Sequence, residues 1–326
     1  MPVPVRQDLP VRELYPELEA NATGTLAADG MHRVYYEESG NDEGIPVIYL
    51  HGGPGSGSNE NHRRYFDPSR YRIIIFDQRG CNRSTPRGET RNNTTWDLVA
   101  DMESLRRELE IDTWLVYGGS WGATLGLLYA QTHPERVRGM ILRGTFLARQ
   151  EDLDWFMVSG DNRIFPEAWE NFIDFLPEAE QRDPVAAYYR RVHGEDEALR
   201  RRAARAWSDW AGTIVTWMLP EITATAVDEE QVLHEVLIET HYARNRYFIE
   251  ENQILAHAGR LPDVPIHIIH GRRDMTCTLS ASWALHRALP QSRLTVVRDG
   301  GHLAGEPVMT DALVTATDEM AELLKA

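Results

Sequence analysis

Short apolar runs that alternate with helical patterns constrain the fold of this chain more than any other feature. Apolar or β-rich residues predict strands over 31–38, 46–50, 72–76, 114–117, 137–142, 266–269 and 294–297, and helical patterns lie at about 95–110, 121–133, 279–289 and 309–325. Strands that alternate with helices predict a mostly parallel sheet covered by helices on both faces. The expected fold class is therefore α/β.

The alternation stops between residues 146 and 262 and resumes at Pro265. We expect this stretch to form a helical cap, inserted between two strands of one sheet and lying over the sheet's carboxyl edge. The core then divides into residues 1–145 and 263–326. The stretch has helical spacing and holds five of the nine tryptophans, namely Trp155, Trp169, Trp207, Trp210 and Trp217.

The charge balance excludes some classes of partner. Lys and Arg number 34 against 50 Asp and Glu, and the resulting net charge of −16 repels phosphate backbones and anionic membrane surfaces. We therefore expect a small peptide or small-molecule substrate, with no nucleic acid and no membrane as partner, and we leave the oligomeric state open.

The segment 1–8 and the cysteines bear on the compartment. Residues 1–8 lack the basic-then-apolar pattern of a signal peptide, and no run in the chain approaches the roughly 18 apolar residues of a membrane span. Cys81 and Cys277 are too few for a disulfide framework, which agrees with a reducing compartment. These features predict a cytoplasmic protein.

The segment Gly118-Gly-Ser-Trp-Gly122 follows an apolar strand and opens a helix, which is the context of a nucleophile elbow. In such a turn the serine is held in a strained conformation with its hydroxyl above the sheet edge, and the flanking glycines remove Cβ atoms that would clash. Ser120 is therefore the candidate nucleophile. The backbone N–H of Trp121, at the start of the helix, is a candidate oxyanion donor.

A serine hydroxyl needs a base, and the base needs an orienting carboxylate. Asp274 follows the predicted strand 266–269, and His302 follows the strand 294–297, so both project from the same sheet edge as Ser120. The order serine, acid, histidine is that of the α/β-hydrolases. The remaining candidates are Asp299 as a rival acid, His270, which precedes the acid in the chain, and His133, at the end of the helix after the elbow.

The loop His51-Gly-Gly-Pro-Gly55 follows the strand 46–50 and predicts the second half of an oxyanion hole, with the Gly53 N–H as donor. No glycine-rich phosphate motif is present, because residues 52–57 do not satisfy G-x-G-x-x-G and no G-x-x-x-x-G-K occurs. The segment 234–238 begins like a zinc motif but has Ile238 where the second histidine must be. We expect no metal and no cofactor.

With these residues the chain resembles the proline iminopeptidases, or prolyl aminopeptidases, which are α/β-hydrolases that cleave an N-terminal proline from peptides. The resemblance implies Ser120, Asp274 and His302 as the triad and Gly53 and Trp121 as the oxyanion donors. The similar segments are 51–55 (HGGPG), 77–84 (DQRGCNRS), 93–101 (NTTWDLVAD), 118–122 (GGSWG), 163–169 (RIFPEAW), 271–274 (GRRD) and 300–307 (GGHLAGEP).

The cap departs from that family at one position. The family binds the substrate's α-amino group with two glutamates, one in Trp-x-x-Trp-Glu and one in Glu-Asn-His-Tyr-Phe. Here Glu239 matches the second, but Ala211 stands in place of the first, directly after Trp210. We expect Glu239, Trp210 and Ala211 to contact substrate. Either Asp209, Glu235 or another carboxylate replaces the missing acid, or the substrate has a weaker demand for an N-terminal cation.

Three hypotheses follow. The first is a cofactor-free serine peptidase that releases an N-terminal proline or a similar small residue through a Ser-His-Asp acyl-enzyme mechanism. The second, motivated by Ala211, is an amidase, esterase or acyl transferase acting on a small metabolite. The third is a non-catalytic binding protein of the same fold, against which the intact triad argues.

Overall fold

The structure is a computed structural model that describes residues 5–6, 12–219 and 228–325. Of the N-terminal segment discussed above, residues 1–4 and 7–8 lie outside these ranges. The strands are β1 (Val5–Arg6), β2 (Ala22–Ala27), β3 (Arg33–Gly40), β4 (Ile45–Leu50), β5 (Tyr71–Phe76), β6 (Trp114–Gly119), β7 (Val137–Arg143), β8 (Ile266–Gly271) and β9 (Arg293–Val297).

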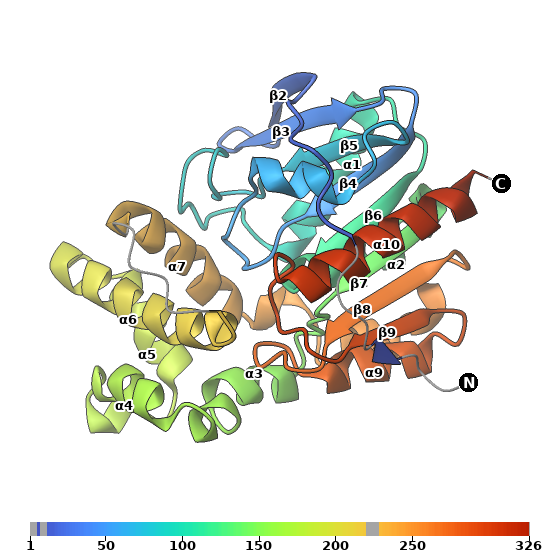
Figure 1. Cartoon of the computed structure of the whole chain (residues 1–326). Coiled ribbons are helices and arrows are strands. Elements are labelled where there is room, and N and C mark those ends of the chain that lie inside the picture. Colours follow the sequence, from blue (N-terminus) through green and yellow to red (C-terminus); the bar gives the residue numbers. More distant parts are fainter. Residues whose placement is uncertain (1–4, 7–11, 220–227, 326) are drawn as a thin grey trace.

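The described strands form one nine-stranded sheet in the order β1-β9-β8-β7-β6-β4-β5-β3-β2. In this spatial order, each neighbouring pair from β1 through β9, β8, β7, β6 and β4 to β5 is parallel. The strand β3 pairs antiparallel with both β5 and β2. The α/β class predicted from the sequence is confirmed. Because β4, β6, β8 and β9 run in the same direction, the residues that follow each of them meet at one edge of the sheet (Figure 1).

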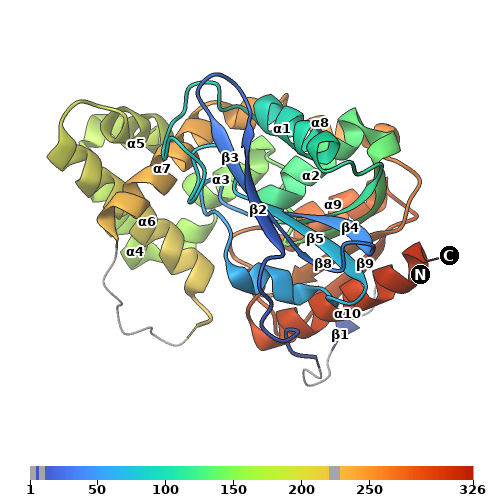
Figure 2. The ribbon, with the colours of Figure 1, turned by 90° about the horizontal axis from the view of Figure 1, so that it is seen from above.

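Helices cover both faces of the sheet. Figure 2 shows α1 and α2 on one side and α10 on the other. Side chains alternate along each strand, so that Ile48 and Leu50 of β4 join the cluster with α1 and α2, while Val47 and Tyr49 join the cluster with α10. These flanking helices are α1 (Thr95–Glu108), α2 (Trp121–Thr132), α9 (Leu279–Ala288) and α10 (Pro307–Leu324).

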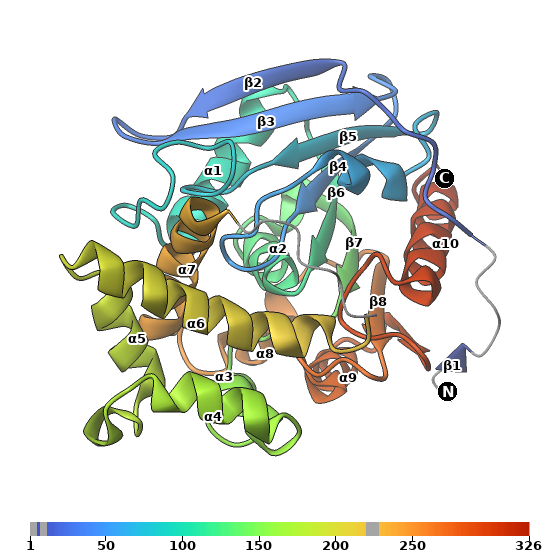
Figure 3. The same ribbon diagram turned by 60° about the vertical axis from the view of Figure 1, so that its left-hand side comes forward.

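Between β7 and β8 the described chain holds no strand and forms mainly helices (Figure 3). Their apolar faces make a third core, separate from the two beside the sheet, around Trp207, Trp210, Phe172 and Tyr188. No helix in the described ranges is both long and apolar enough to span a bilayer. The helices are α3 (Gln150–Met157), α4 (Pro166–Asp174), α5 (Pro184–Val192), α6 (Glu197–Thr216), α7 (Glu229–Arg244) and α8 (Gln253–Ala256).

Candidate active site

Ser120 occupies a sharp turn between β6 and α2, with φ 57° and ψ −123°. A residue other than glycine at this φ is strained, and the strain is tolerated because the surroundings hold the turn. The Ser120 N–H donates to the carbonyl oxygen of Arg143 at 2.8 Å. A Cβ on Gly122 would lie 2.1 Å from the Leu50 carbonyl oxygen, so the helix can start this close to β4 only with glycine there.

Asp274 and His302 form a hydrogen-bonded pair beside this turn. The Asp274 Oδ2 atom lies 2.8 Å from the His302 Nδ1 atom, and Asp274 Oδ1 accepts the Cys277 backbone N–H at 2.8 Å. Burial raises the pKa of Asp274, but the charge and hydrogen bond of His302, together with the nearby His270 and the Cys277 N–H, outweigh it and keep the pKa below its ordinary value. The carboxylate is therefore ionised and holds the Nδ1 side of the His302 ring, which makes Nε2 the predicted base for Ser120.

The rival candidates are placed elsewhere. Asp299 is half-exposed and pairs with Arg273 at the surface. His270 is buried, with its two ring nitrogens 2.7 Å from Ser282 Oγ and 2.8 Å from the Cys277 carbonyl oxygen. His133 follows the last turn of α2, where its ring packs against Tyr129. Of these candidate histidines, His302 alone borders the same cavity as Ser120, and its ring is hydrogen-bonded to the Asp274 carboxylate.

The loop after β4 lies against the nucleophile turn. A Cβ on Gly52 would be 3.5 Å from the Ser120 Cβ, so the loop backbone at Gly52 lies close to the nucleophile turn. Gly53 has φ +106°, a conformation that glycine adopts without strain. The Trp121 N–H belongs to the first turn of α2, where backbone donors have no partner within the helix. The loop after β4 and the first turn of α2 therefore both lie beside Ser120, and the oxyanion role of the Gly53 and Trp121 N–H groups stays a prediction.

A cavity of about 820 Å³ opens over this sheet edge and is bordered by both Ser120 and His302. Its size is in the range of small-ligand sites. The Cys277 sulfur lies 3.9 Å from the Ser120 hydroxyl oxygen. The other residues that border it include His51, Gly52, Gly53, Arg143, Phe146, Asp152, Phe156, Met157, Trp207, Ala211, Val215, Glu239, Ala243, Tyr247 and Glu306.

Glu239 of α7 borders the cavity opposite the sheet and accepts a hydrogen bond from the Trp207 indole at 2.6 Å. Burial, which outweighs the hydrogen bond from Trp207, raises the pKa of Glu239 to about 8. Ala211 and Ala243 also border the cavity, one helical turn after Trp207 and Glu239 respectively. At this position α6 and α7 therefore present the Glu239 carboxyl to the cavity, next to small apolar side chains.

The predicted substrate contact of Trp210 is not supported by its position. Trp210 is 1% exposed, packs against Phe172 and Trp169, and does not border the cavity. Its neighbour Trp207, three residues earlier on α6, borders it instead. Both tryptophans lie on the buried side of α6, and helical spacing alone does not tell which of them reaches the cavity and which fills the core between the helices.

The two acids expected to replace the missing glutamate do not border the cavity either. Asp209 is exposed and pairs with Arg205 at 2.7 Å, and Glu235 accepts a hydrogen bond from Gln231 at 2.8 Å. Asp152 and Glu306 do border it. However, Asp152 is held by Arg149, and the Glu306 oxygens accept the N–H groups of Gly301 and Leu303.

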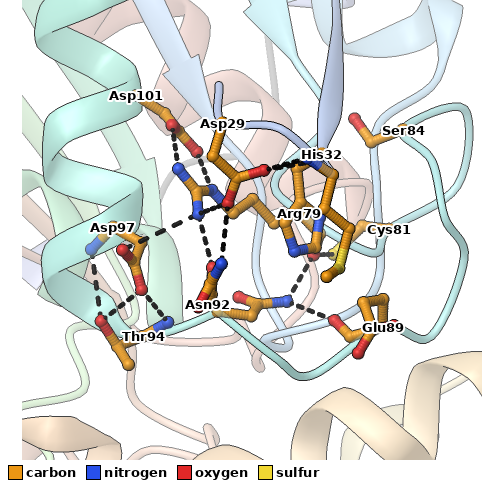
Figure 4. Close-up of polar contacts among 12 residues, drawn as sticks. Asp29, His32, Arg79, Cys81, Ser84, Glu89, Asn92, Thr94, Asp97 and Asp101 are labelled. Atoms are coloured by element: carbon orange, nitrogen blue, oxygen red, sulfur yellow. Dashed lines mark hydrogen bonds and ion pairs between the residues drawn. The ribbon is translucent and has the colours of Figure 1, made fainter. Parts of the chain in front are cut away.

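The segment after β5, residues 77–84, supports the loop that carries Gly53. Asp77 accepts hydrogen bonds from the Ser58 N–H and hydroxyl at 2.8 and 2.6 Å. Arg79 forms a bidentate ion pair with Asp101 of α1, at 2.6 and 2.7 Å, and also donates a hydrogen bond to Asp29 (Figure 4). The signal in the sequence is a polar run directly after a buried strand at the sheet's carboxyl edge, and sequence reasoning assigned it no role.

The described residues contain no group of three or more His, Cys, Asp or Glu side chains that could hold a metal ion. The side chains and backbone of the site itself are equipped for one kind of reaction. A strained serine, a histidine paired to a buried carboxylate and two backbone donors are the parts that acyl transfer requires.

Comparison with known proteins agrees with this chemistry. Residues 45–306 match the model of the alpha/beta hydrolase fold family. The proline iminopeptidase of Xylella fastidiosa strain 9a5c is 48% identical over 94% of this chain and 99% of its own length. A probable proline iminopeptidase of Leptolyngbya boryana is 47% identical over 94% and 97%, and that of Arabidopsis thaliana is 42% identical over 96% and 83%.

Solved structures show the same fold at lower identity. VinJ matches with a TM-score of 0.62 and 19% identity, covering 94% of this chain and all of its own. A proline iminopeptidase-related protein from Thermus thermophilus matches with a TM-score of 0.56 and 20% identity, covering 93% and 97%. The sequence matches span nearly the whole chain, and the chain therefore belongs to the proline iminopeptidase family of α/β-hydrolases.

Proposed function

We propose that this protein is a serine peptidase that releases an N-terminal proline, or a similar small residue, from short peptides. The observation that carries the proposal is that Ser120, Glu239 and His302, which is paired with the buried Asp274, all border one cavity. An aminopeptidase needs both a nucleophile and an acid that holds the free α-amino group, and this cavity offers the two together. The family relationship supports the same activity.

In this mechanism His302 Nε2 removes the Ser120 proton as the hydroxyl oxygen attacks the carbonyl carbon of the N-terminal residue. The N–H groups of Gly53 and Trp121 hold the oxyanion, and Asp274 stabilises the imidazolium that forms. His302 then donates its proton to the leaving amine, and the peptide departs. Water, activated by the same histidine, releases proline from the acyl-enzyme and restores the Ser120 hydroxyl.

We assign Glu239 to the substrate ammonium. A neutral carboxyl costs less to bury than a carboxylate, and the raised pKa of about 8 keeps Glu239 protonated in the empty cavity near neutral pH. When an ammonium enters, its positive charge favours the carboxylate, and the pair neutralises itself. Trp207 holds the carboxyl in place through its indole N–H.

Proline and alanine p-nitroanilides, assayed beside p-nitrophenyl esters of short acids, test the proposal. We expect turnover of the proline anilide, with the alanine anilide slower. Ester hydrolysis without cleavage of either anilide would overturn the peptidase assignment and favour the second function, an amidase, esterase or acyl transferase acting on a small metabolite. Ala211 is the observation that favours this alternative, because it leaves an apolar side chain where a second acid is needed.

Replacing Ala211 with glutamate is expected to lower KM for the proline anilide by about tenfold, because one additional close charge pair in a partly desolvated site contributes on the order of 1–2 kcal/mol. The matched control is Ala211→Gln, which adds the same volume without charge. Steady-state kinetics at fixed pH distinguish the two. An equal change in both variants would assign the effect to volume, and no change in either would mean that the present acid already suffices.

Replacing Glu239 with glutamine is expected to weaken proline anilide binding and to remove a pH dependence. In the parent enzyme Glu239 ionises as pH rises through about 8, so KM should fall between pH 6 and 8, whereas in the variant it should stay flat. Glu230→Gln, an exposed acid near the start of α7 and outside the cavity, is the control. An unchanged KM profile in Glu239→Gln would remove Glu239 from amine recognition.

The same substitution has a consequence for stability. Because the pKa of Glu239 is higher in the folded protein than in the unfolded chain, the folded state binds the extra proton, and stability falls as pH rises from about 4.5 to about 8. Relative to the parent, the Tm of Glu239→Gln should therefore increase between pH 5 and 9, by about 2–4 °C. A thermal melt series at both pH values measures this difference.

We also propose the division of the chain into a core of residues 1–145 and 263–326 and a cap of residues 146–262. In support, Trp207, Ala211 and Glu239, which border the cavity, come from helices of this cap segment, whereas Ser120 and His302 follow strands of the sheet. A cytoplasmic location agrees with Cys81 and Cys277 both being free thiols. Fractionation of cells that express a tagged chain tests the location.

A further inference from the structure

The Gln78 side chain joins the two halves of the candidate oxyanion hole. It follows β5 and is 1% exposed. Its Nε2 atom donates to the His51 carbonyl oxygen at 3.0 Å, and its Oε1 atom accepts the Trp121 indole N–H at 2.8 Å. His51 begins the loop that carries Gly53, and Trp121 carries the other backbone donor. One amide therefore bridges two segments that are about 70 residues apart in the sequence.

The chemistry of the two partners fixes the orientation of this amide. An indole N–H only donates and a carbonyl oxygen only accepts, so the side chain between them must offer one acceptor and one donor. Of the uncharged side chains of this length, glutamine alone provides both. Glutamate would place a second acceptor against the His51 carbonyl, and methionine would leave both buried partners without a hydrogen bond.

The Gln78 backbone adds a third contact to the same loop. Its N–H donates to His51 Nε2 at 3.0 Å, which leaves Nδ1 as the protonated ring nitrogen, 2.9 Å from the Gly52 carbonyl oxygen. Burial lowers the pKa of His51, in keeping with a neutral ring. The carbonyl oxygens of His51 and Gly52, which directly precede Gly53, are thus both held, and both contacts depend on the position of Gln78.

We propose that Gln78 is a positioning residue that sets the relative placement of the Gly53 and Trp121 backbone donors around the Ser120 oxyanion. This rests on the proposed acyl-transfer function of Ser120. Gln78 does not touch substrate, because the cavity is bordered by His51 and Gly53 and not by Gln78 itself. Its effect is expressed through the geometry of the two donors, and oxyanion stabilisation is sensitive to that geometry.

The neighbours of Gln78 allow its side chain to be tested separately from the fold. Asp77 accepts hydrogen bonds from Ser58 and Arg83. Arg79 donates to Asp101 (Figure 4). The backbone on each side of Gln78 is therefore anchored by ion pairs and hydrogen bonds that the substitution leaves intact. Losing the Gln78 amide should change the donor placement without unfolding the segment.

The first experiment compares Gln78→Met with the parent enzyme on the proline anilide. We expect kcat to fall about 30-fold with KM within about twofold, because the lost contacts act on the transition state and not on ground-state binding. Ser84→Ala is the matched control. It removes buried hydrogen bonds to the Asp77 carbonyl and from the Tyr35 N–H in the same segment, outside the cavity lining, and should leave kcat within about twofold.

Two ligands separate positioning from general loosening of the site. Pyrrolidine-2-boronic acid forms a tetrahedral adduct with a serine and places a hydroxyl in the oxyanion hole, whereas prolinol carries the same ring and amine without that adduct. In Gln78→Met the boronic acid should bind about 30-fold more weakly, in step with kcat, and prolinol should bind as in the parent. Equal weakening of both ligands would overturn the proposal.

A second variant keeps the test decisive if Gln78→Met is unstable. Trp121→Phe removes the indole N–H while keeping an aromatic ring and the backbone donor, so it breaks the same hydrogen bond from the other side. Combined in a double-mutant cycle, the two substitutions should lower kcat by less than the product of their separate effects. Independent, multiplicative effects on kcat would contradict the bridging role.

The oxyanion hole can also be measured without a peptide substrate. If the parent enzyme fails to cleave the proline anilide, the peptidase assignment fails, but hydrolysis of p-nitrophenyl acetate and the rate of Ser120 labelling by a fluorophosphonate still report on the oxyanion hole. Both rates should be about 30-fold lower in Gln78→Met than in Ser84→Ala. Equal rates in these two variants would overturn the positioning role whatever the substrate.

Discussion

Replacing Ser120 with alanine is expected to lower kcat for the proline anilide by a factor on the order of 10⁵, because removal of a triad nucleophile leaves only the oxyanion hole and substrate binding to accelerate hydrolysis. The fold should tolerate the change, since the hydroxyl's contact with the Cys277 sulfur, at 3.9 Å, is long and contributes little to stability. Steady-state kinetics and loss of fluorophosphonate labelling measure the effect together.

Cys277 provides the control, because its sulfur is a second nucleophilic atom near the reacting position. Burial, reinforced by the Asp274 charge, raises the pKa of its thiol, so the sulfur stays protonated and does not substitute for the missing hydroxyl. Cys277→Ala should keep kcat within about fivefold of the parent. A Ser120→Ala enzyme that retained a tenth of the activity would show that another group attacks the carbonyl, and Cys277 would then be the first residue to examine.

The core of the fold could be predicted because it depends on local patterns. Ile73, Ile74 and Ile75 of β5 are all 0% exposed, as a strand covered on both faces requires, and such continuous apolar runs are visible in a single sequence. The strand β2 was not predicted, because it lacks such a run. Ala22–Ala27 is a partly exposed edge strand without an apolar run, and only its pairing with β3 makes it regular.

The candidate site was predictable where a residue follows a strand, and less so where it lies on a helix. Ser120, Asp274 and His302 each come soon after a predicted strand, and parallel strands bring such residues to one edge. Trp210 was assigned to the substrate, although Trp207 borders the cavity, since the helices between β7 and β8 also need a core of their own. Gln78 could not be predicted from the sequence, because its proposed role depends on hydrogen bonds with His51 and Trp121, which are distant from it in the chain.

Replacing Asp274 with asparagine is expected to lower kcat by about 10³–10⁴-fold while leaving KM for the proline anilide within a few fold. The carboxylate does two things that an amide cannot do. It accepts from the protonated His302 Nδ1, which keeps Nε2 free to take the Ser120 proton, and its charge stabilises the imidazolium that follows. An asparagine can present an N–H to Nδ1 instead and favour the unproductive tautomer.

The control for this substitution is Asp299→Asn, which makes the same chemical change at the rival acid. Asp299 is half-exposed and paired with Arg273, so its removal should change kcat by less than about twofold. The buried His270 lies 3.5 Å from Asp274 Oδ2, and its two hydrogen bonds, to Ser282 and to the Cys277 carbonyl, keep it from replacing His302 as the base. If Asp299→Asn lost activity and Asp274→Asn kept it, the orienting acid would be misassigned, and the imidazole of His302 would have to turn toward the surface in the working enzyme.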